Sequence, residues 1–168
     1  MSYHIYTTTG LVLSERPLRE ADRVYSILTR DLGLVRATAT GVRKSTSKLR
    51  GSLEPVTLAD ISLVRGKEYW RITSAQTRRR VALKVALLRP LALLEKLVQG
   101  ESAHPELFDA VEEFLTHPEP EGELFEPRFV ATMLYHLGYL KEEDLKLGKA
   151  ALVKAINEGL RQSQLAGE

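Results

Sequence analysis

The sequence contains no cysteine. This absence excludes disulfide bonds, thiolate catalysis and any zinc site built on cysteine sulfur. The 4 histidines are scattered along the chain, and none has the spacing of an H-E-x-x-H zinc helix. We therefore predict that the protein binds no metal and needs no cofactor.

The glycine motifs with which many enzymes hold nucleotide phosphates are also missing, since neither G-x-x-x-x-G-K-S/T nor G-x-G-x-x-G occurs. Ser45 and Ser47 lie among cations, but no histidine or glycine elbow is near enough in the sequence to activate either hydroxyl. The sequence thus predicts a protein without a catalytic site.

A small nuclease or other hydrolase is a weaker alternative, because Glu15, Glu20 and Asp22 form one close set of carboxylates in the basic half of the chain. Glu20 and Asp22 could equally be ion-pair partners of Arg19 and Arg23.

No long apolar run is present, because the best candidate, residues 81–98, is interrupted by charged residues and a proline. We therefore expect no membrane-spanning segment. The first residues, Met-Ser-Tyr-His-Ile, lack the charged and apolar regions of a secretory signal, so a cytoplasmic location is expected.

Charge is divided unequally between the two halves of the chain. Residues 1–80 hold 15 Lys/Arg and 7 Asp/Glu (+8), residues 81–168 hold 9 and 15 (−6), and the two balances sum to the net +2. Such a division suggests a basic module for a polyanion joined to an acidic module with another role. Chance clustering of charge within one small domain is the alternative.

The most basic stretch, here named the basic loop, runs from Gly41 to Gly51 with the sequence Gly-Val-Arg-Lys-Ser-Thr-Ser-Lys-Leu-Arg-Gly. No acidic residue occurs between Asp31 and Glu54. Ammonium, guanidinium and hydroxyl donors on one loop suit phosphate oxygens, because each cation that neutralises a phosphate releases condensed counterions. A solvated surface loop that happens to be basic is the equally weighted alternative.

The first part of the sequence has the pattern of a small β-barrel. Five segments rich in β-branched and aromatic residues are separated by turn signals. These segments are residues 3–14, 22–30, 34–42, 55–64 and 68–75. Gly10, inside the first segment, indicates a bulge or a sharp bend. The strand count and the bend favour a five-stranded oligonucleotide-binding (OB) fold, with an SH3-like barrel as its competitor.

From Arg80 onward the apolar residues recur at helical spacing. Helices are predicted over residues 81–98, 104–116, 124–137 and 149–164, with a Pro/Glu linker at 117–122 and a short acidic helical turn at 141–147. Pro90 could divide or kink the first helix. The predicted fold class is therefore α+β, with an OB-fold barrel over residues 1–79 and an all-α helical domain over residues 80–168.

Three aromatic residues lie on predicted strands, Tyr25, Tyr69 and Trp70, where exposed rings can stack nucleic-acid bases. Because side chains alternate across a strand, Tyr69 and Trp70 cannot both face a ligand. We predict Trp70 in the core, and Tyr69 with Arg71 on the outer face. Arg78–Arg80 either extends the basic surface or forms a solvated start to the first helix.

Several segments of the first half share residues and spacing with a known family. They are Gly10–Leu13, Glu20–Arg23, Leu28–Gly33, the basic loop, Leu53–Pro55 and Arg65–Gly66. On these residues the chain resembles the N-terminal barrel of the RecO-type DNA repair and recombination mediators of bacteria. More loosely, Arg128–Leu134 with His136–Tyr139 resembles the Arg-Phe…Leu-Gly-Tyr helix of the same family.

This resemblance implies an OB barrel and a helical domain that bind single- and double-stranded DNA and anneal complementary strands without ATP, in DNA repair and homologous recombination. The cations of the basic loop match the basic barrel loop of the family, Arg23 and Arg36 match nearby basic positions, and Arg71 widens the track. The predicted DNA-binding residues are Arg23, Arg36, Arg43, Lys44, Lys48, Arg50 and Arg71.

The resemblance also implies protein partners and a location. Members of this family work with a RecR-type ring protein and dock the acidic C-terminal tail of single-stranded DNA-binding protein. A basic residue on the helical domain helps to hold that tail in relatives, and Arg128 is the matching position. The expected location is the bacterial cytoplasm, in association with the nucleoid.

The sequence departs from the family pattern in two ways. Many relatives carry a four-cysteine zinc segment after the Leu-Gly-Tyr, whereas this chain passes directly to Lys141–Asp144. The helical part is also shorter than usual, so part of the tail-docking groove could be absent. The alternative function is a non-catalytic adaptor whose basic barrel binds an acidic protein partner and has no general affinity for oligonucleotides.

Overall fold

The structure is a computed structural model that describes residues 3–117 and 122–165. The chain folds into two compact units: the first extends to Leu83 and also includes Val98–Ala103, and the second comprises Lys84–Leu97 and the chain from His104 onward. The first unit is the barrel and the second is helical. Within the described residues, no helix has the length and apolarity needed to cross a bilayer.

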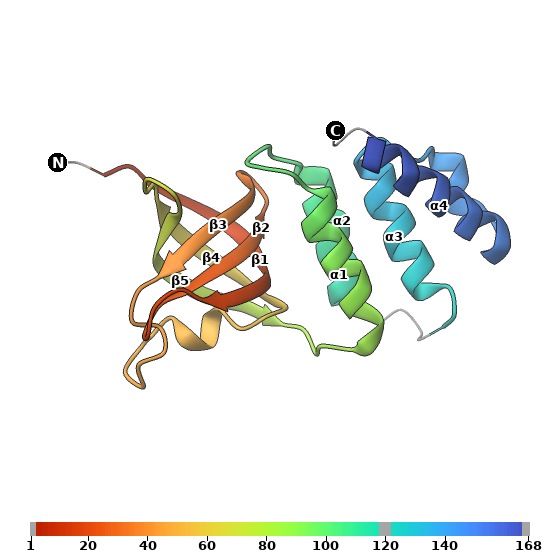
Figure 1. Ribbon diagram of the computed structural model, residues 1–168. Helices are drawn as coiled ribbons and strands as arrows, with labels where there is room; N and C mark the ends of the chain where they lie inside the picture. Colours follow the sequence, from red (N-terminus) through yellow and green to blue (C-terminus); the bar gives the residue numbers. More distant parts are fainter. Residues whose placement is uncertain (1–2, 118–121, 166–168) are drawn as a thin grey trace. The chain divides into compact units, whose positions relative to one another are not determined.

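Five strands form the barrel (Figure 1). They are β1 (Ile5–Pro17), β2 (Arg23–Thr29), β3 (Gly33–Ala39), β4 (Thr57–Val64) and β5 (Trp70–Arg80). The strands pair in the closed order β1-β2-β3-β5-β4, and every contact is antiparallel except that between β3 and β5. The predicted five-stranded OB barrel is therefore confirmed.

The first strand is shared by both sides of the barrel, since its first half pairs with β4 and its second half with β2. Gly10 lies where these halves meet. A Cβ atom at this position would lie 2.6 Å from the Ile27 side chain, so the close approach requires glycine. The predicted irregularity in this strand occurs just after the glycine, as a shift of register between Val12 and Ser14.

The barrel core contains two of the aromatic residues that were considered for base stacking. Trp70 is 4% exposed, which confirms its predicted place in the core, whereas the expectation that Tyr25 could stack bases is wrong because its side chain is 2% exposed. Both belong to one cluster with residues such as Val12, Ile27 and Leu63. The strand pattern around Tyr25 is an imperfect alternation, and such a pattern does not determine which residues face inward.

The last strand is longer than predicted and includes Arg78–Arg80. Thr57 pairs with Arg80, and the Val81 amide still donates to the Val56 carbonyl at 3.2 Å. The backbone at Val81 is therefore bound to the barrel, and the first helix begins later than its apolar pattern indicated. This correction places the three arginines on the barrel and not at the start of a helix.

The segment Val98–Ala103 belongs to the barrel although helices flank it in the sequence. The amide of Leu34 donates to the Gly100 carbonyl at 3.1 Å. The Glu101 carboxylate accepts hydrogen bonds from the Trp70 indole N–H and from Arg65, each at 2.8 Å. This segment therefore satisfies the polar group of the buried tryptophan.

The second unit has four helices, α1 (Val85–Leu97), α2 (Pro105–Thr116), α3 (Phe125–His136) and α4 (Lys149–Leu165). The acidic turn predicted at 141–147 is a 3₁₀ helix, η2 (Glu142–Lys146), and part of the predicted linker, residues 118–121, lies outside the described residues. Pro90 lies inside α1 and does not divide it.

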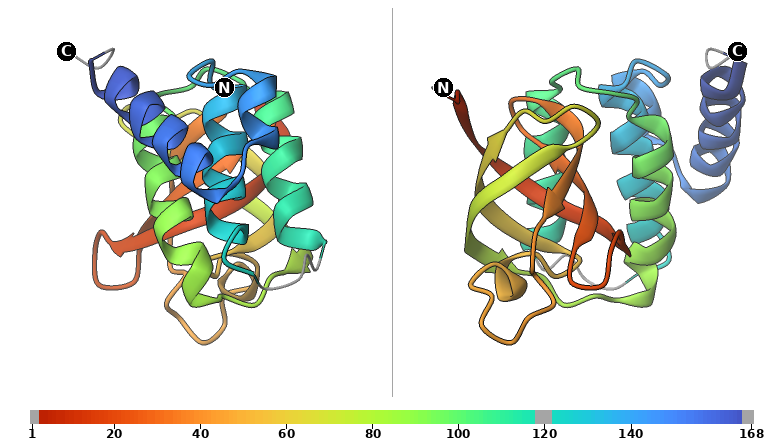
Figure 2. Two further views of the ribbon diagram at one scale, coloured as in Figure 1. Left: turned by 90° about the vertical axis from the view of Figure 1, so that its right-hand side faces the viewer. Right: turned by 60° about the vertical axis from the view of Figure 1, so that its left-hand side comes forward.

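Helix α3 is the centre of this unit, because it packs against α1, α2 and α4. Its residues Phe129, Ala131, Met133 and Leu134 are fully buried, and the Phe129 ring stacks on Phe114 of α2 with centroids 5.0 Å apart. Figure 2 shows α4 crossing α3 obliquely.

We predict that Gly33→Ala destabilises the barrel more than Gly100→Ala. Both glycines have positive φ, +74° and +72°, so alanine strains the backbone by about 1–2 kcal/mol at either site. A Cβ at Gly33 would also lie 2.4 Å from the Ser102 carbonyl oxygen, whereas a Cβ at Gly100 meets nothing within 4 Å. We expect Gly33→Ala to cost roughly 1–3 kcal/mol more than Gly100→Ala.

The measurement is denaturant unfolding followed by fluorescence of the single tryptophan, which reports on the barrel alone. Equal losses of the free energy of unfolding for the two variants would contradict this packing.

Candidate nucleic-acid interface

The backbone of the basic loop is fixed to the barrel at its first residues. The Gly41 amide donates to the Asp22 carboxylate at 2.7 Å, and the Arg43 amide donates to the Ala21 carbonyl at 3.2 Å. Val42 between them is buried in the barrel core, as is Leu53 just beyond the loop. The loop, which ends in a short 3₁₀ helix η1 (Arg50–Ser52), is therefore presented from a firm base.

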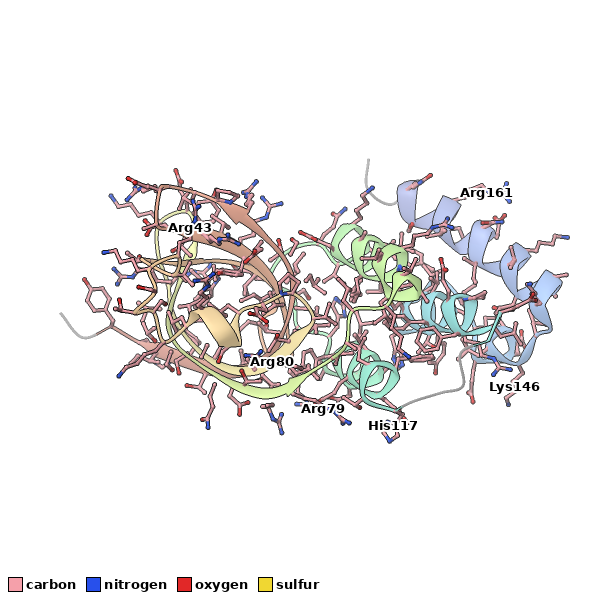
Figure 3. The ribbon with its side chains drawn as sticks, turned by 90° about the horizontal axis from the view of Figure 1, so that it is seen from below. Arg43, Arg79, Arg80, His117, Lys146 and Arg161 are labelled. Atoms are coloured by element: carbon pink, nitrogen blue, oxygen red, sulfur yellow. The ribbon has the colours of Figure 1, made fainter. Side chains whose placement is uncertain are left out.

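The cations of this loop point into solvent. Arg43, Lys44, Lys48 and Arg50 are all exposed, and within the part of the chain that the structure describes none of them forms an ion pair. Arg43, labelled in Figure 3, donates one hydrogen bond to the Glu20 carbonyl at 2.9 Å. The loop thus offers four cations whose charge no carboxylate of the described residues neutralises.

A second group of cations lies on the outer face of the strands. The pairing registers join Arg16 to Val24, Val24 to Thr38, and Thr38 to Arg71, so these residues form one row across β1, β2, β3 and β5. Arg36 lies two residues from Thr38 and therefore shares its face. Arg16, Arg36 and Arg71 are exposed.

Arg16 is the member of this surface that the sequence analysis missed. It was missed because β1 continues to Pro17, whereas the predicted strand stopped at Ser14. The Arg16 guanidinium donates to the Tyr69 hydroxyl at 3.5 Å, a bond that spans β2 and β3 on this face.

Arg23 differs from the other predicted DNA-binding residues because its charge is already matched. Its guanidinium forms a half-buried ion pair with Glu15. The same carboxylate accepts a hydrogen bond from the Tyr25 hydroxyl, and burial together with the nearby Glu15 charge raises the pKa of Tyr25 to about 12. Glu15, Arg23 and Tyr25 therefore form one polar group at the end of the barrel.

The arginines at the end of β5 adjoin the basic loop. Arg80 donates to the Gly51 carbonyl at 2.8 Å and lies 3.6 Å from Glu54, while Arg78 lies 3.8 Å from Asp60. Arg79 is exposed, and Figure 3 shows Arg79 and Arg80 on the barrel. Arg78 and Arg80 therefore each lie within ion-pair distance of a carboxylate, as Arg23 does, so Arg79 is the member of this group that adds an unpaired cation to the surface within the described residues.

Two of the three carboxylates proposed for a hydrolase, Glu15 and Asp22, have structural partners. Glu15 pairs with Arg23, and Asp22 accepts the Gly41 amide. Among the described residues, no three His, Asp or Glu side chains gather in a way that could hold a metal ion.

Arg128, the predicted tail-binding residue, borders a cavity of about 450 Å³ in the helical unit. The other lining residues are Glu113, Phe114, His117, Gly122, Leu124 and Phe125. Arg128 is exposed, whereas Phe114, Leu124 and Phe125 are partly buried and provide an apolar wall. The cavity thus combines aromatic surface with one guanidinium, one carboxylate (Glu113) and one imidazole, from His117 at the end of α2 (Figure 3).

The first unit is thus an OB-fold domain with an exposed cationic surface, and comparison with known proteins identifies the family. Residues 1–81 match the family "Recombination protein O N terminal". A "DNA repair protein RecO" of Dehalococcoides mccartyi is 34% identical over 150 residues, which cover 83% of this chain and 58% of that protein.

Two further relatives with the same name match over shorter stretches. That of a Synechococcus species is 51% identical over 77 residues, 46% of this chain and 25% of the relative. That of Gloeobacter violaceus is 36% identical over 100 residues, 60% of this chain and 38% of the relative. The chain therefore belongs to the RecO family. It spans little more than half of the Dehalococcoides relative, at 58%.

The raised pKa of Tyr25 predicts a loss of stability at high pH. The folded protein keeps this phenol protonated up to about pH 12, whereas an unfolded chain ionises it near the ordinary tyrosine value of about 10. The contribution of the protonated Tyr25 phenol to the free energy of unfolding is on the order of 2 kcal/mol. It is fully present below pH ~10 and is lost as the pH rises toward 12.

The measurement is the difference in tyrosinate absorbance between the native protein and Tyr25→Phe during alkaline titration, together with their unfolding free energies. If the absorbance change that Tyr25→Phe removes is centred near the ordinary tyrosine pKa of about 10, burial and Glu15 do not raise the pKa of this phenol.

Proposed function

We propose that this protein is a DNA-binding recombination mediator that holds single- and double-stranded DNA on its barrel and anneals complementary strands without ATP or catalysis, in DNA repair and homologous recombination. The observation that carries this proposal is the set of four exposed cations on an anchored loop, none of which pairs with a carboxylate of the described residues. Such a loop can follow a sugar-phosphate backbone because its contacts do not depend on base sequence.

The proposed track extends from the basic loop onto the strand face. Arg43, Lys44, Lys48 and Arg50 contact phosphates, with Arg36 and Arg71 widening the surface, and we place Arg23 at its margin because Glu15 neutralises its charge. Binding through phosphates leaves most base edges free, which is what the pairing of a second strand requires.

We further propose that the cavity beside Arg128 receives the acidic C-terminal tail of single-stranded DNA-binding protein. A terminal carboxylate would pair with the guanidinium while an apolar side chain contacts Phe114 and Phe125. A RecR-type ring protein is the second proposed partner, and the bacterial nucleoid is the proposed location.

The adaptor with an acidic protein partner is the competing function. It shares the cationic surface but predicts no general affinity for oligonucleotides, so direct DNA binding separates the two.

We predict that replacing the four loop cations by alanine flattens the salt dependence of single-strand binding. Counterion release gives a log–log slope of about −0.7 per neutralised phosphate, so four lost contacts reduce the slope by up to about 3. The measurement is fluorescence anisotropy of a labelled single strand across a salt series, followed by addition of the complementary strand to monitor annealing.

The matched control removes four exposed cations of the helical unit, Lys96, Lys146, Lys154 and Arg161. If the loop variant has the same salt slope as the native protein, the loop does not contact DNA phosphates. If the native protein binds no DNA even at low salt, the adaptor function is favoured.

For the helical cavity, we predict that Arg128→Ala weakens binding of an acidic peptide with an apolar C-terminal residue by at least about tenfold, because a charge-assisted hydrogen bond is lost. Amidation of the peptide C-terminus should have a similar effect on the native protein and little effect on the variant. Calorimetric titration tests this, with Lys154→Ala as the control. If Arg128→Ala and amidation of the peptide weaken binding independently, so that their effects add, the carboxylate does not contact Arg128.

A further inference from the structure

Two aromatic rings of the barrel remain on its surface. Tyr3 is 62% exposed and Tyr69 is partly exposed, whereas Tyr25 and Trp70 are buried and Tyr6 packs against the core. Neither surface ring is explained by the packing of the barrel. Both are therefore available to a ligand.

Each ring lies beside a guanidinium. The Arg71 guanidinium lies 6.0 Å from the centroid of the Tyr3 ring, and the Tyr69 hydroxyl accepts from Arg16 at 3.5 Å. Tyr69 and Arg71 flank Trp70, whose side chain is buried, so both of them project outward from the same segment.

These contacts place cations and rings in alternation, in the order Arg16, Tyr69, Arg71 and Tyr3. This is an order in space and not in sequence: Arg16 and Arg71 belong to one register row, while Tyr3 lies 13 or more residues from each of the others in the sequence. A single strand presents the matching alternation, with a phosphate and an unpaired base in every nucleotide. A duplex does not, because its bases are stacked on one another.

We propose that Arg16, Tyr69, Arg71 and Tyr3 form a binding track selective for single strands, in which bases stack on the two tyrosine rings and phosphates pair with the two arginines. This inference rests on the proposed DNA-binding function and adds a strand preference and two stacking residues to it. A base held on a tyrosine is released when it pairs with a complementary strand, so the track is compatible with annealing.

Two of the acidic groups near this track are paired, whereas Glu68, next to Tyr69 in the sequence, is exposed and forms no ion pair among the described residues. Glu15 pairs with Arg23, and Glu101 is bound by Arg65 and Trp70. Arg16 and Arg71 have no carboxylate partner within the described ranges, so their charge is available to phosphate.

The test compares the native protein with Tyr3→Ala, Tyr69→Ala and Tyr69→Phe on three probes: oligothymidylate, an abasic strand of equal length, and a duplex. Each alanine variant is expected to bind oligothymidylate at least about fivefold more weakly, since base–aromatic stacking contributes about 1 kcal/mol or more per base. The salt slope should not change, because stacking releases no counterions. Tyr69→Phe should retain most of the affinity, because it keeps the ring.

On the abasic strand, the native protein and the alanine variants should bind alike, and duplex affinity should also be unchanged. Tyr139→Ala, in the helical unit, is the control, and the unfolding midpoint of each variant verifies its fold.

Equal weakening on all three probes, or no weakening on oligothymidylate, would overturn the stacking track while leaving the DNA-binding function in place. A native protein that binds none of the probes would overturn both.

Discussion

Closure of the barrel depends on a parallel contact only two residue pairs long. Ala37 pairs with Trp70 and Thr38 with Arg71, and the Thr38 hydroxyl adds a hydrogen bond to the Trp70 carbonyl at 3.2 Å. On the inside, the indole of Trp70 fills the core, and its N–H donates to Glu101. On the outside, the same short seam presents Arg71 to solvent. Core packing and the cationic face therefore depend on the same two residue pairs.

The availability of the cations follows from how the nearby acidic residues are used. The Asp22 carboxylate accepts a hydrogen bond from the Gly41 backbone amide. The Glu15 carboxylate forms an ion pair with Arg23 and accepts a hydrogen bond from the Tyr25 hydroxyl. Neither is left to pair with the loop side chains. A carboxylate that is bound to the backbone of a basic loop leaves the cations of that loop free of ion pairs and available to a polyanion.

The elements with strong local signals could be predicted from the sequence. The five strands and the helices of the second unit follow from a change of hydrophobic period at Arg80 and from turn residues such as Gly33 and Gly138. The inward position of Tyr25 could not be predicted, because it depends on strand register, including the shift between Val12 and Ser14. The pairing of Arg23 with Glu15 and the Arg16–Tyr69 contact depend in the same way on which strands are neighbours. The Arg128 position came from family resemblance, since nothing local marks a cavity.

The segment Val98–Ala103 makes the barrel a discontinuous domain. It follows the first helix in the chain, yet it supplies the acceptors for the Leu34 amide and for the Trp70 indole. A fragment truncated at Leu83 would retain all five strands and still lack these two acceptors, one of them for a buried tryptophan. The minimal autonomous barrel is therefore longer than its strands indicate, and a soluble fragment of it needs the chain through Ala103.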